Sequence, residues 1–426
     1  MAAGLAVSQA GTATAADSLT SLGDVTGAGD VAVGGGKVFI AMDDRIIVAD
    51  TQGVLTGSVA GLSEARDLIT TPDGTRLYAA LRWSHEVAEI NTADLAVIRR
   101  INLSAYQCPD RLALSGNRLW VSYGCPASSV GGAVGLDLST ATPQPVPIPT
   151  GSLPEAPEIA AAGNTLVVAS FWDLRVYDTQ NGAATLRGAI DAYDHQLWNG
   201  WGRVALAPDG LTAYTTPGSA NDFDAWDLTS LTKARSYGKE EGVLDYGHIT
   251  VSPDGTQVAV SRNTNDVNDD PLVLFDLSSG EKTQTFAQTH VEFKDLAFSG
   301  SDVFAVVERS GDRTLHLWRL HGATLPSCKL VLNGPDTSGR FKQVTFTGQL
   351  TRHDGSAPGV QTLTATRRPW GEDFQPLPDV TTNADGTFTF TNVPGVETTW
   401  TYKVYYDNTS GSRNCSASKT VEVSGW

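Results

Sequence analysis

Seven ionisable side chains recur at similar intervals along the first three quarters of the chain, and together they could do chemistry. Each stands at the start of a short apolar segment that is followed by a tight turn and a second apolar segment, and successive members lie 37 to 47 residues apart. The set comprises Asp30, Asp67, Arg111, Glu158, Arg203, His248 and Asp295. Carboxylates, guanidinium groups and an imidazole could pair with one another or bind a polar ligand. The two interpretations are compatible, and the sequence does not choose between them.

The elements that must position these side chains are copies of one strand-turn-strand unit. Residues 247–261, GHITVSPDGTQVAVS, are the clearest copy, and residues 66–81 and 202–216 carry related text around a Pro-Asp-Gly turn. Four weaker copies lack the proline. A repeat of this length and content is typical of a β-propeller, with one four-stranded blade per repeat. Seven copies predict an all-β fold with seven blades, and we call the face at which the innermost strands begin the top face.

The two ends of the repeat region complement each other. The last repeat has no fourth strand after residues 315–320, and the segment 18–23 precedes the first repeat without a partner of its own. We therefore expect the N-terminal strand to complete the last blade, which would remove a free sheet edge.

The repeats also carry a family resemblance. The stretches TPDGTRLYAAL and SPDGTQVAVS resemble the YVTN/lactonase-type propellers, a broad family of seven-bladed repeats, over residues 17–322. A blade signature implies architecture rather than activity. Lactonase-type and lyase relatives place a His, a Glu and an Arg in the top funnel, and the resemblance offers His248, Glu158 and Arg203 for those roles.

The composition changes after the last repeat. Residues 344–350, 361–366, 386–390 and 399–406 alternate polar and apolar side chains, as expected for short strands of a β-sandwich. The region resembles the bacterial Ig-like modules of secreted proteins. We predict three regions: 1–16, a signal-peptide remnant or a flexible arm; 17–323, the propeller; and 324–426, the Ig-like sandwich.

The four cysteines fall into two pairs, each within one predicted domain. The pairs are Cys108 with Cys125 and Cys328 with Cys415. An even number of cysteines in local pairs favours disulfides in an oxidising compartment, whereas buried free thiols are the alternative. A bond that closes a loop as long as the second would contribute about 4 to 5 kcal/mol in the chain-entropy model. We predict that the protein is secreted or displayed at the cell surface.

Charge and apolar content exclude some partners. The net charge of −17 argues against nucleic acid, because phosphate binding needs a basic surface. The sequence contains no run of about 18 apolar residues, which is the length a helix needs to span a bilayer.

The loops predicted at the top face are rich in aromatic residues. Rings that stack on apolar surfaces beside polar groups are typical of sugar or peptide recognition, although some of these rings could pack between blades instead. The predicted ligand-binding loop residues are Tyr106, Trp172, Tyr193, His195, Trp198, Trp201 and Tyr246, with Trp83, His85 and Asp173 near them.

One acidic loop is a weak candidate for calcium. Asp266, Asn268 and Asp270 offer oxygen ligands at short spacing, but the later Glu of an EF-hand is absent, and a solvated loop is the simpler interpretation. No other cofactor is expected.

The sequence lacks the common catalytic signatures. It contains no Gly-x-Ser-x-Gly, no His-Glu-x-x-His and no phosphate-binding loop. The leading hypothesis is therefore a secreted, non-enzymatic recognition protein that binds a glycan, a peptide or a partner subunit through the top face, as one component of an extracellular assembly. The alternatives are a lactonase-like hydrolase or lyase acting around His248, and a purely structural module.

Overall fold

The computed structural model describes most of the chain. The described residues are 17–24, 29–125, 130–151, 153, 155–180, 182–195, 201–217, 223–238, 246–262, 272–286, 291–309, 314–324, 328–352, 355–370, 374–406 and 415–425. The chain divides into two compact units, Asp17–His321 and Gly322–Trp426. In the described residues the only helical element is one 3-10 turn, η1 (Tyr193–His195), so the all-β prediction is confirmed. None of these residues forms a helix long and apolar enough to cross a membrane.

The described part of the first unit forms seven four-stranded antiparallel sheets. Six of them are built from consecutive strands. The first three contain β2 (Val31–Gly34), β3 (Lys37–Ala41), β4 (Arg45–Asp50), β5 (Leu55–Ala60); β6 (Ala65–Thr70), β7 (Arg76–Leu81), β8 (Glu86–Asn91), β9 (Val97–Asn102); and β10 (Pro109–Ser115), β11 (Arg118–Tyr123), β12 (Gly132–Asp137), β13 (Val146–Pro147). The next three contain β14 (Glu158–Ala162), β15 (Thr165–Ala169), β16 (Asp173–Asp178), β17 (Thr185–Asp191); β18 (Trp201–Leu206), β19 (Thr212–Pro217), β20 (Phe223–Asp227), β21 (Thr232–Tyr237); and β22 (Tyr246–Val251), β23 (Gln257–Arg262), β24 (Leu272–Asp276), β25 (Lys282–Phe286).

The seventh sheet joins the two ends of the unit. It contains β26 (Val291–Ser299), β27 (Asp302–Arg309), β28 (Thr314–Leu320) and, as its outer strand, β1 (Ser18–Asp24). β1 runs antiparallel to β28, with Ser18 opposite Arg319 and Asp24 opposite Thr314. Leu22 of β1 is buried in an apolar cluster with side chains from β27 and β28.

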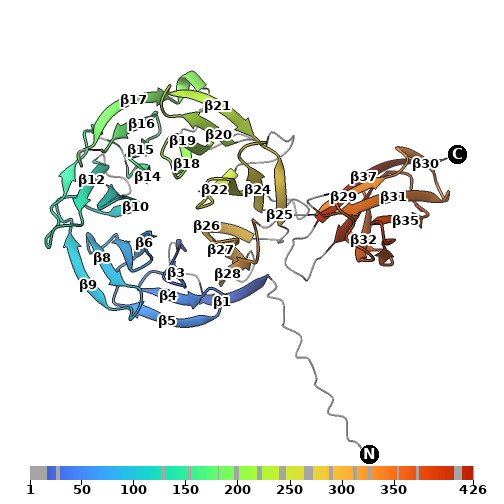
Figure 1. Cartoon of the computed structure of the whole chain (residues 1–426), viewed down its shortest axis with the longest axis horizontal. Coiled ribbons are helices and arrows are strands. Elements are labelled where there is room, and N and C mark those ends of the chain that lie inside the picture. Colours follow the sequence, from blue (N-terminus) through green and yellow to red (C-terminus); the bar gives the residue numbers. More distant parts are fainter. Residues whose placement is uncertain are drawn as a thin grey trace, which may run out of the picture. The chain divides into compact units, whose positions relative to one another are not determined.

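The innermost strands of the sheets form a closed ring. Each of β2, β6, β10, β14, β18 and β22 contacts the innermost strand of the next sheet, and β26 contacts β2. Figure 1 shows the sheets in chain order around this ring, with β9, β17 and β21 on the outside. Apolar residues fill the space between neighbouring sheets, as in the cluster that joins Leu81 and Ala65 of one sheet to Phe39 and Val48 of the other. Burial between sheets therefore holds the ring together.

The Pro-Asp-Gly turns have a clear local cause. Gly74 adopts φ +68°, in the left-handed region that favours glycine, and a Cβ there would lie 2.4 Å from the backbone N of Gly35 in the preceding sheet. The carboxylate of Asp73 accepts the backbone N–H of Thr75 at 3.0 Å. The same side-chain cap occurs at Asp254, which accepts the N–H of Thr256 at 3.1 Å. Local hydrogen bonding and glycine thus fix each hairpin.

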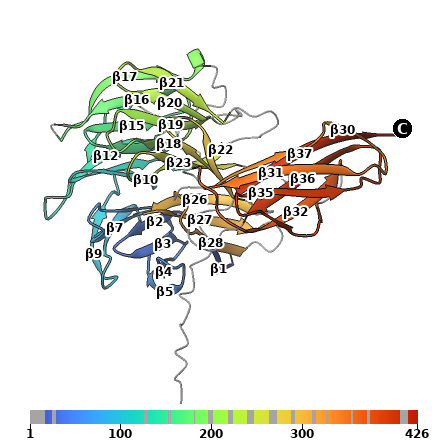
Figure 2. The ribbon, with the colours of Figure 1, turned by 45° about the vertical axis from the view of Figure 1, so that its right-hand side comes forward.

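The second unit consists of two sheets around one apolar core. Its strands are β29 (Lys329–Asn333), β30 (Thr337–Gly339), β31 (Val344–Thr351), β32 (Thr362–Pro369), β33 (Gln375–Pro376), β34 (Val380–Thr381), β35 (Thr387–Asn392), β36 (Thr399–Tyr406) and β37 (Cys415–Ser424). One sheet has the order β29-β31-β35, and the other has the order β30-β37-β36-β32-β33, with β34 paired to β32. Figure 2 shows the long strands β31, β36 and β37 within this unit.

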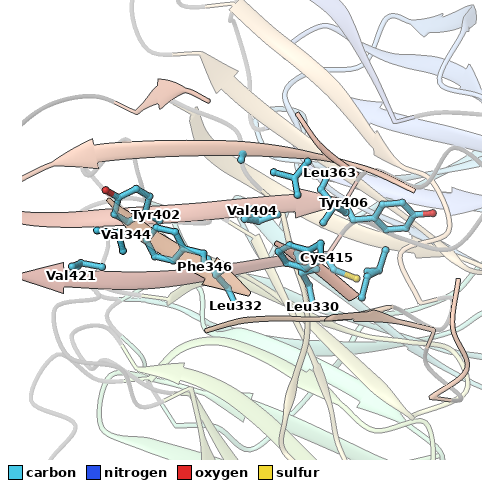
Figure 3. Close-up of a cluster of buried hydrophobic side chains, with 14 of the residues drawn as sticks. Leu330, Leu332, Val344, Phe346, Leu363, Tyr402, Val404, Tyr406, Cys415 and Val421 are labelled. Atoms are coloured by element: carbon cyan, nitrogen blue, oxygen red, sulfur yellow. The ribbon is translucent and has the colours of Figure 1, made fainter. Parts of the chain in front are cut away.

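Alternation of side chains builds this core. In β36, Trp400, Tyr402, Val404 and Tyr406 are buried, while the residues between them are partly exposed. Figure 3 shows Tyr402, Val404 and Tyr406 between the strands together with Phe346 and Leu363. A disulfide joins Cys328 to Cys415 at the edge of the core.

Candidate functional site

The seven ionisable residues that recur in the sequence meet at one cavity in the first unit. The cavity has a volume of about 140 Å³. All seven side chains line it, and five apolar residues that each follow one of the seven complete the lining. We call Asp30, Asp67, Arg111, Glu158, Arg203, His248 and Asp295 the ring residues.

β-Bulges position most of the ring residues. The pairing register between the first and second strands shifts next to Asp67, Arg111, Arg203, His248 and Asp295. A bulge locally interrupts the ladder and re-aims a side chain. In these sheets it lies at the start of the innermost strand, where that strand meets the cavity.

Hydroxyl groups take over the hydrogen bonds that three of these bulges leave open. The backbone N–H of Arg111 donates to Ser122 Oγ at 3.0 Å, and that of Arg203 donates to Thr216 Oγ1 at 3.0 Å. The N–H of His248 donates to Ser261 Oγ at 2.7 Å. Each hydroxyl belongs to the second strand of the same sheet. The backbone of each of these ring residues is therefore fixed within its own sheet, independently of the contacts of its side chain.

Three ring aspartates connect neighbouring sheets through the backbone. Asp295 Oδ2 accepts the N–H of Val31 at 3.1 Å. Asp30 Oδ2 accepts the N–H of Leu68 at 2.7 Å, and Asp67 Oδ2 accepts the N–H of Leu112. In each case the donor follows the ring position of the next sheet. These contacts connect four successive sheets at the centre of the ring.

Two ion pairs and a hydrogen bond connect the remaining ring side chains. Glu158 Oε1 accepts from Arg111 Nε at 3.0 Å and from Arg203 Nη1 at 2.6 Å. His248 Nδ1 lies 3.2 Å from Asp295 Oδ1. The ion pairing that the sequence suggested is therefore present. It occupies charged groups that would otherwise be free to bind a ligand.

Burial perturbs the acids on one side of the ring. Burial raises the pKa of the Asp30 carboxyl well above its usual range, and repulsion from Asp67 and Asp295 and a hydrogen bond with Asp67 add to this rise. Burial also raises the pKa of Asp67 to about 6, against the opposing effects of Arg111 and of hydrogen bonds with Asp30 and the Leu112 N–H. These two carboxyl groups therefore hold protons more readily in the folded protein than in the unfolded chain.

The other two acids respond differently. Burial raises the pKa of Glu158, and the charge of Arg111 opposes that rise. Burial would raise the pKa of Asp295 as well, but the hydrogen bond and electrostatic attraction to His248 bring that pKa below its usual value. The ring thus contains one side, around Asp30 and Asp67, where burial raises the carboxyl pKa values, and another side where Glu158 and Asp295 are paired with basic side chains.

The raised carboxyl pKa values predict a stability that falls as the pH rises. Between the usual value of 3.8 and about 6, folded Asp67 binds more protons than the unfolded chain, so the free energy of unfolding decreases through this window. Asp67→Asn removes this titration while an amide oxygen can still accept the Leu112 N–H. We expect the variant to be more stable than wild type at about pH 8, by about 1 to 3 kcal/mol, and similar to it at about pH 3.5, where Asp67 is largely protonated in both the folded and the unfolded chain.

Urea unfolding at both pH values measures this difference. Glu281→Gln, which removes an exposed carboxylate far from the ring, is the control and should track wild type at both pH values. Parallel stability curves for Asp67→Asn and wild type would show that Asp67 does not titrate in this window.

The predicted aromatic residues of the loops divide into exposed and packed side chains. Trp172 is 66 % exposed and Tyr193 is 71 % exposed, and Trp83 is 59 % exposed. Phe171, which the sequence analysis did not single out, is 45 % exposed and its ring lies edge-on to that of Trp172, with the ring centres 4.7 Å apart. The loop between β15 and β16 therefore presents two adjacent rings to solvent.

The other described candidates contact neighbouring side chains within the unit, and only Trp201 among them is fully buried. Trp201 is buried, with its ring edge-on to that of Trp226 at 5.0 Å, and His195 lies 4.7 Å from the same Trp226 ring. Tyr106 packs edge-on against Tyr123 at 5.1 Å. These contacts agree with the alternative raised from the sequence, in which such side chains pack between elements of the protein. Asp173 bonds Arg175 at 2.7 Å.

Several predicted sites lie outside the described part of the structure. They are Trp198, the side chain of Tyr246, the segment 1–16 and the calcium candidates Asp266, Asn268 and Asp270. Among the described residues, no group of three or more His, Cys, Asp or Glu side chains is arranged to hold a metal ion.

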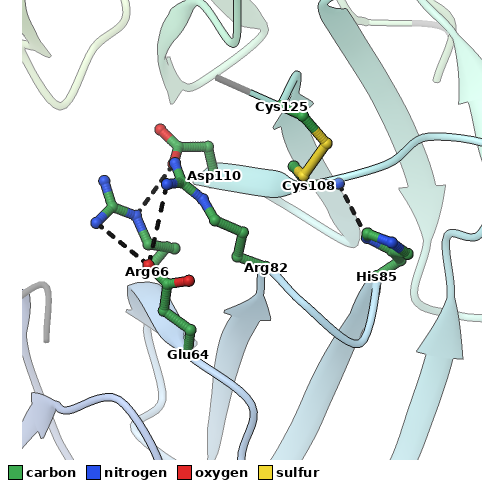
Figure 4. The surroundings of a disulfide bond; sticks show 7 residues. All are labelled: Glu64, Arg66, Arg82, His85, Cys108, Asp110 and Cys125. Carbon is green, nitrogen blue, oxygen red and sulfur yellow. Dashed lines mark hydrogen bonds and ion pairs between the residues drawn. A yellow bond between two sulfur atoms is a disulfide. The ribbon is translucent and has the colours of Figure 1, made fainter. Parts of the chain in front are cut away.

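A disulfide fixes the loops beside the ring. Cys108, just before β10, is bonded to Cys125, just after β11, and the Cys108 N–H donates to His85 Nδ1 at 3.1 Å (Figure 4). Asp110, two residues after Cys108, accepts from Arg66 at 3.2 Å and from Arg82. Attraction to these arginines and to Arg111 outweighs burial and lowers the pKa of Asp110. Together with Cys328–Cys415, both predicted disulfides are present.

Comparisons with known proteins identify the fold. No protein-family model matches the sequence, and no curated protein matches it. The β-propeller domain of Cps50 (Swd1) from Myceliophteria thermophila matches with a TM-score of 0.54 and 12 % identity, over 71 % of this chain and 99 % of that domain. Hydrazine synthase from Kuenenia stuttgartiensis matches with a TM-score of 0.55 and 15 % identity, over 70 % of this chain and 97 % of that chain. Identities this low establish the fold and nothing about activity, and the closed ring of four-stranded sheets is accordingly a β-propeller.

Proposed function

We propose that this chain is a secreted, non-enzymatic recognition protein that binds a protein partner through the top face of a seven-bladed propeller. The observation that carries the proposal is the distribution of exposed aromatic side chains. Among the described residues of the unit Asp17–His321, the exposed aromatic residues are Trp83, Phe171, Trp172 and Tyr193. All four lie in loops that either lead into an innermost strand or connect a second strand to a third, and both kinds of loop belong to the top face.

Exposed aromatic rings are costly to leave in water and are enriched in the buried centres of protein interfaces. A partner that covers Phe171, Trp172 and Tyr193 would bury three rings at once. Trp and Tyr have few rotatable bonds, so ordering them on binding costs little conformational entropy. This chemistry favours a protein or peptide surface with apolar side chains.

The contacts inside the ring support recognition over catalysis. A lactonase-like or lyase mechanism would use His248, Glu158 and Arg203, but Glu158 is held between two arginines and His248 is paired with Asp295. The cavity of about 140 Å³ is smaller than the roughly 300 to 1,000 Å³ of most small-molecule sites. We infer that the ring residues serve mainly to join the blades.

The two disulfides support the secreted location, because such bonds persist in oxidising compartments. We propose that residues 1–16 belong to a signal peptide or form a flexible arm, that residues 17–323 are the recognition domain, and that residues 324–426 are an Ig-like spacer or second docking surface. Alternating strands in two sheets around one core support the Ig-like assignment.

Capture from the secretome of the native source tests the function. The full chain is used as bait, and the Trp172→Ala/Tyr193→Ala variant is compared with wild type. We expect recovery of the captured partner to fall at least about tenfold, because interface aromatics contribute about 2 kcal/mol or more each at a hot spot. Val97→Ala/Ile98→Ala, which removes exposed apolar side chains from the outer strand β9, is the matched control and should capture as wild type does.

Two results would contradict the proposal. One is equal capture by the top-face variant and wild type. The other is specific binding on a glycan array that disappears in the top-face variant, because the ligand would then be a sugar. A panel of lactones tests the enzymatic alternative, and turnover that depends on His248 and Glu158 would favour it.

A further inference from the structure

We propose that two copies of this chain associate through β35, the edge strand of the second unit, which pairs antiparallel with β35 of the other copy around a two-fold axis at Phe390. The inference goes beyond the proposed function and concerns the other unit. β35 has the sequence TFTFTN and is the outer strand of the sheet β29-β31-β35 (Figure 2). In the described part of the chain it forms a ladder with β31 alone, because β34, which also approaches it, has two residues and pairs with β32. One edge of β35 is therefore left without a strand partner.

The backbone groups at this edge belong to Thr389 and Thr391. In an antiparallel ladder, successive residues direct their N–H and C=O groups alternately toward one neighbouring strand and toward the other. The Leu350 N–H donates to the Gly386 carbonyl at 2.9 Å, so the even-numbered residues of β35 bond to β31. Thr389 and Thr391 therefore direct their N–H and C=O groups toward the open edge, and both residues are exposed.

Thr387, the first residue of β35, agrees with this assignment. Its carbonyl accepts the Asn383 N–H at 2.7 Å, and its own N–H donates to the Asp385 carboxylate at 3.0 Å, so the preceding turn satisfies it. Thr389 and Thr391 thus leave two donors and two acceptors of the main chain without a strand partner among the described residues. A row of such groups is a template for pairing with a further strand.

The other described edge strands carry features that discourage pairing. In the propeller, β1, β5, β9, β17, β21 and β25 each lie beside a register shift, and β13 has two residues, one of them proline. In the second unit, β30 and β33 have three and two residues, and β29 begins with Lys329 and contacts β37 of the other sheet. β35 has six residues in unbroken register, without a charge or a proline. Bulges, charges, prolines and short length are the devices that protect sheet edges, and β35 has none of them.

The sequence of β35 suits a second copy of itself. Thr389-Phe390-Thr391 reads the same in both directions, so antiparallel pairing about Phe390 places Thr389 of each copy opposite Thr391 of the other. The free groups of the two strands then form four hydrogen bonds across the axis, and Thr387 lies outside the paired stretch. The same surface is used on both copies, as a two-fold interface requires.

Side chains and charge also favour this pairing. Phe390 is partly buried, and its ring is stacked on that of Phe346 with the ring centres 4.9 Å apart. The pairing places the two Phe390 side chains opposite each other, and aromatic cross-strand pairs stabilise a sheet. Residues 324–426 contain nine Asp and Glu and nine Lys and Arg, so the second unit is neutral and does not repel its copy.

Sedimentation equilibrium of the full chain tests the association. A contact of two short strands buries less than the roughly 1,200 Å² of stable complexes, so we expect a dimer with a dissociation constant of the order of 0.1 mM. The measurement uses about 0.15 M salt, which screens repulsion between the acidic propellers. A monomer at concentrations up to about fivefold above that value would overturn the inference.

Lysine variants with a matched control locate the contact. Thr389→Lys/Thr391→Lys places like charges opposite each other across the axis and should weaken the dimer at least about tenfold. Thr345→Lys/Thr347→Lys adds the same charge to the same exposed face of the sheet, at the positions of β31 that lie opposite in register, and should weaken it less than about threefold. Equal weakening by the two double variants would overturn the inference. So would a monomeric wild type whose partner capture is lost in Thr389→Lys/Thr391→Lys, because the edge would then bind a strand of another protein.

Cross-linking tests the register without adding charge. Residues directly opposite in a hydrogen-bonded pair have Cα atoms about 5.5 Å apart, which is within the range of a disulfide. We expect an oxidised mixture of the single variants Thr389→Cys and Thr391→Cys to form covalent dimers faster than either variant alone. Faster linkage of Thr389→Cys to itself, or no linkage in any combination, would contradict the pairing about Phe390.

Discussion

A chain that begins at residue 25, and therefore lacks β1, is expected to lose the cooperative unfolding of its propeller. β1 supplies the outer strand of the seventh sheet, and its removal exposes the backbone groups of β28 along a free edge. It also removes Leu22 from the apolar cluster that it shares with Phe304 and Leu317. We expect the melting temperature to fall by about 10 °C or more, with aggregation through the exposed edge.

β1 also contacts the first sheet, so its loss weakens the junction between the first and last sheets. Thr20 Oγ1 donates to the Gly53 carbonyl at 2.8 Å, in the turn between β4 and β5. Within the seventh sheet itself, the N–H of His321, just after β28, donates to the carboxylate of Asp17, just before β1, at 2.8 Å. Differential scanning calorimetry measures the effect, with a chain that begins at Asp17 as control. An unchanged melting temperature in the chain that begins at residue 25 would show that β1 does not stabilise the ring.

Glu158→Ala is expected to destabilise the propeller by about 3 kcal/mol, because it leaves two guanidinium groups without their common carboxylate. Glu158 accepts from Arg111 at 3.0 Å and from Arg203 at 2.6 Å, and the three side chains are only 16 to 30 % exposed. The two positive charges would then repel each other across a small cavity that offers little water.

Urea unfolding with a charge-paired control checks this value. Asp44→Ala breaks the pair with Arg45, whose two side chains are 74 % and 44 % exposed, and should cost less than about 1 kcal/mol. Arg203→Met in the Glu158→Ala background should recover part of the loss, because it removes one of the unpaired cations. Equal costs for Glu158→Ala and Asp44→Ala would mean that the ring pairs stabilise no more than surface pairs.

The repeat allowed the residues at the centre of the propeller to be predicted from the sequence. Because each Pro-Asp-Gly turn is fixed by local hydrogen bonds, aligning the turns places the start of every innermost strand, and the seven residues found there do line one cavity. The contacts among these seven side chains could not be predicted from the sequence. The bulges next to Asp67 and His248, and the hydroxyl of Ser261 that holds one of them, depend on pairing between strands.

The aromatic loops mark the limit of sequence reasoning. Trp172 and Trp201 both stand near strand ends in aromatic-rich text, yet one is 66 % exposed and the other is buried against Trp226. The difference arises because Trp172 lies in a tight loop capped by Ser170, whose hydroxyl oxygen accepts the Trp172 N–H at 3.2 Å, whereas Trp201 begins an innermost strand beside a neighbouring sheet. Phe171 was missed because only its position next to Trp172 in that loop makes it an exposed ring.

The hydrogen bonds of the ring residues leave one junction between neighbouring sheets less connected than the others. Side-chain contacts between ring residues, or from a ring residue to the neighbouring backbone, cross six of the seven junctions between sheets. At the junction between the sheets of β18 and β22, no such contact occurs among the described residues, and a hydroxyl of Thr216 reaches the Gly247 carbonyl at 3.0 Å instead. This junction lacks the ring-residue contact that the other six junctions have, so we expect it to open first during local unfolding. Solvent is then expected to enter the propeller between those two blades.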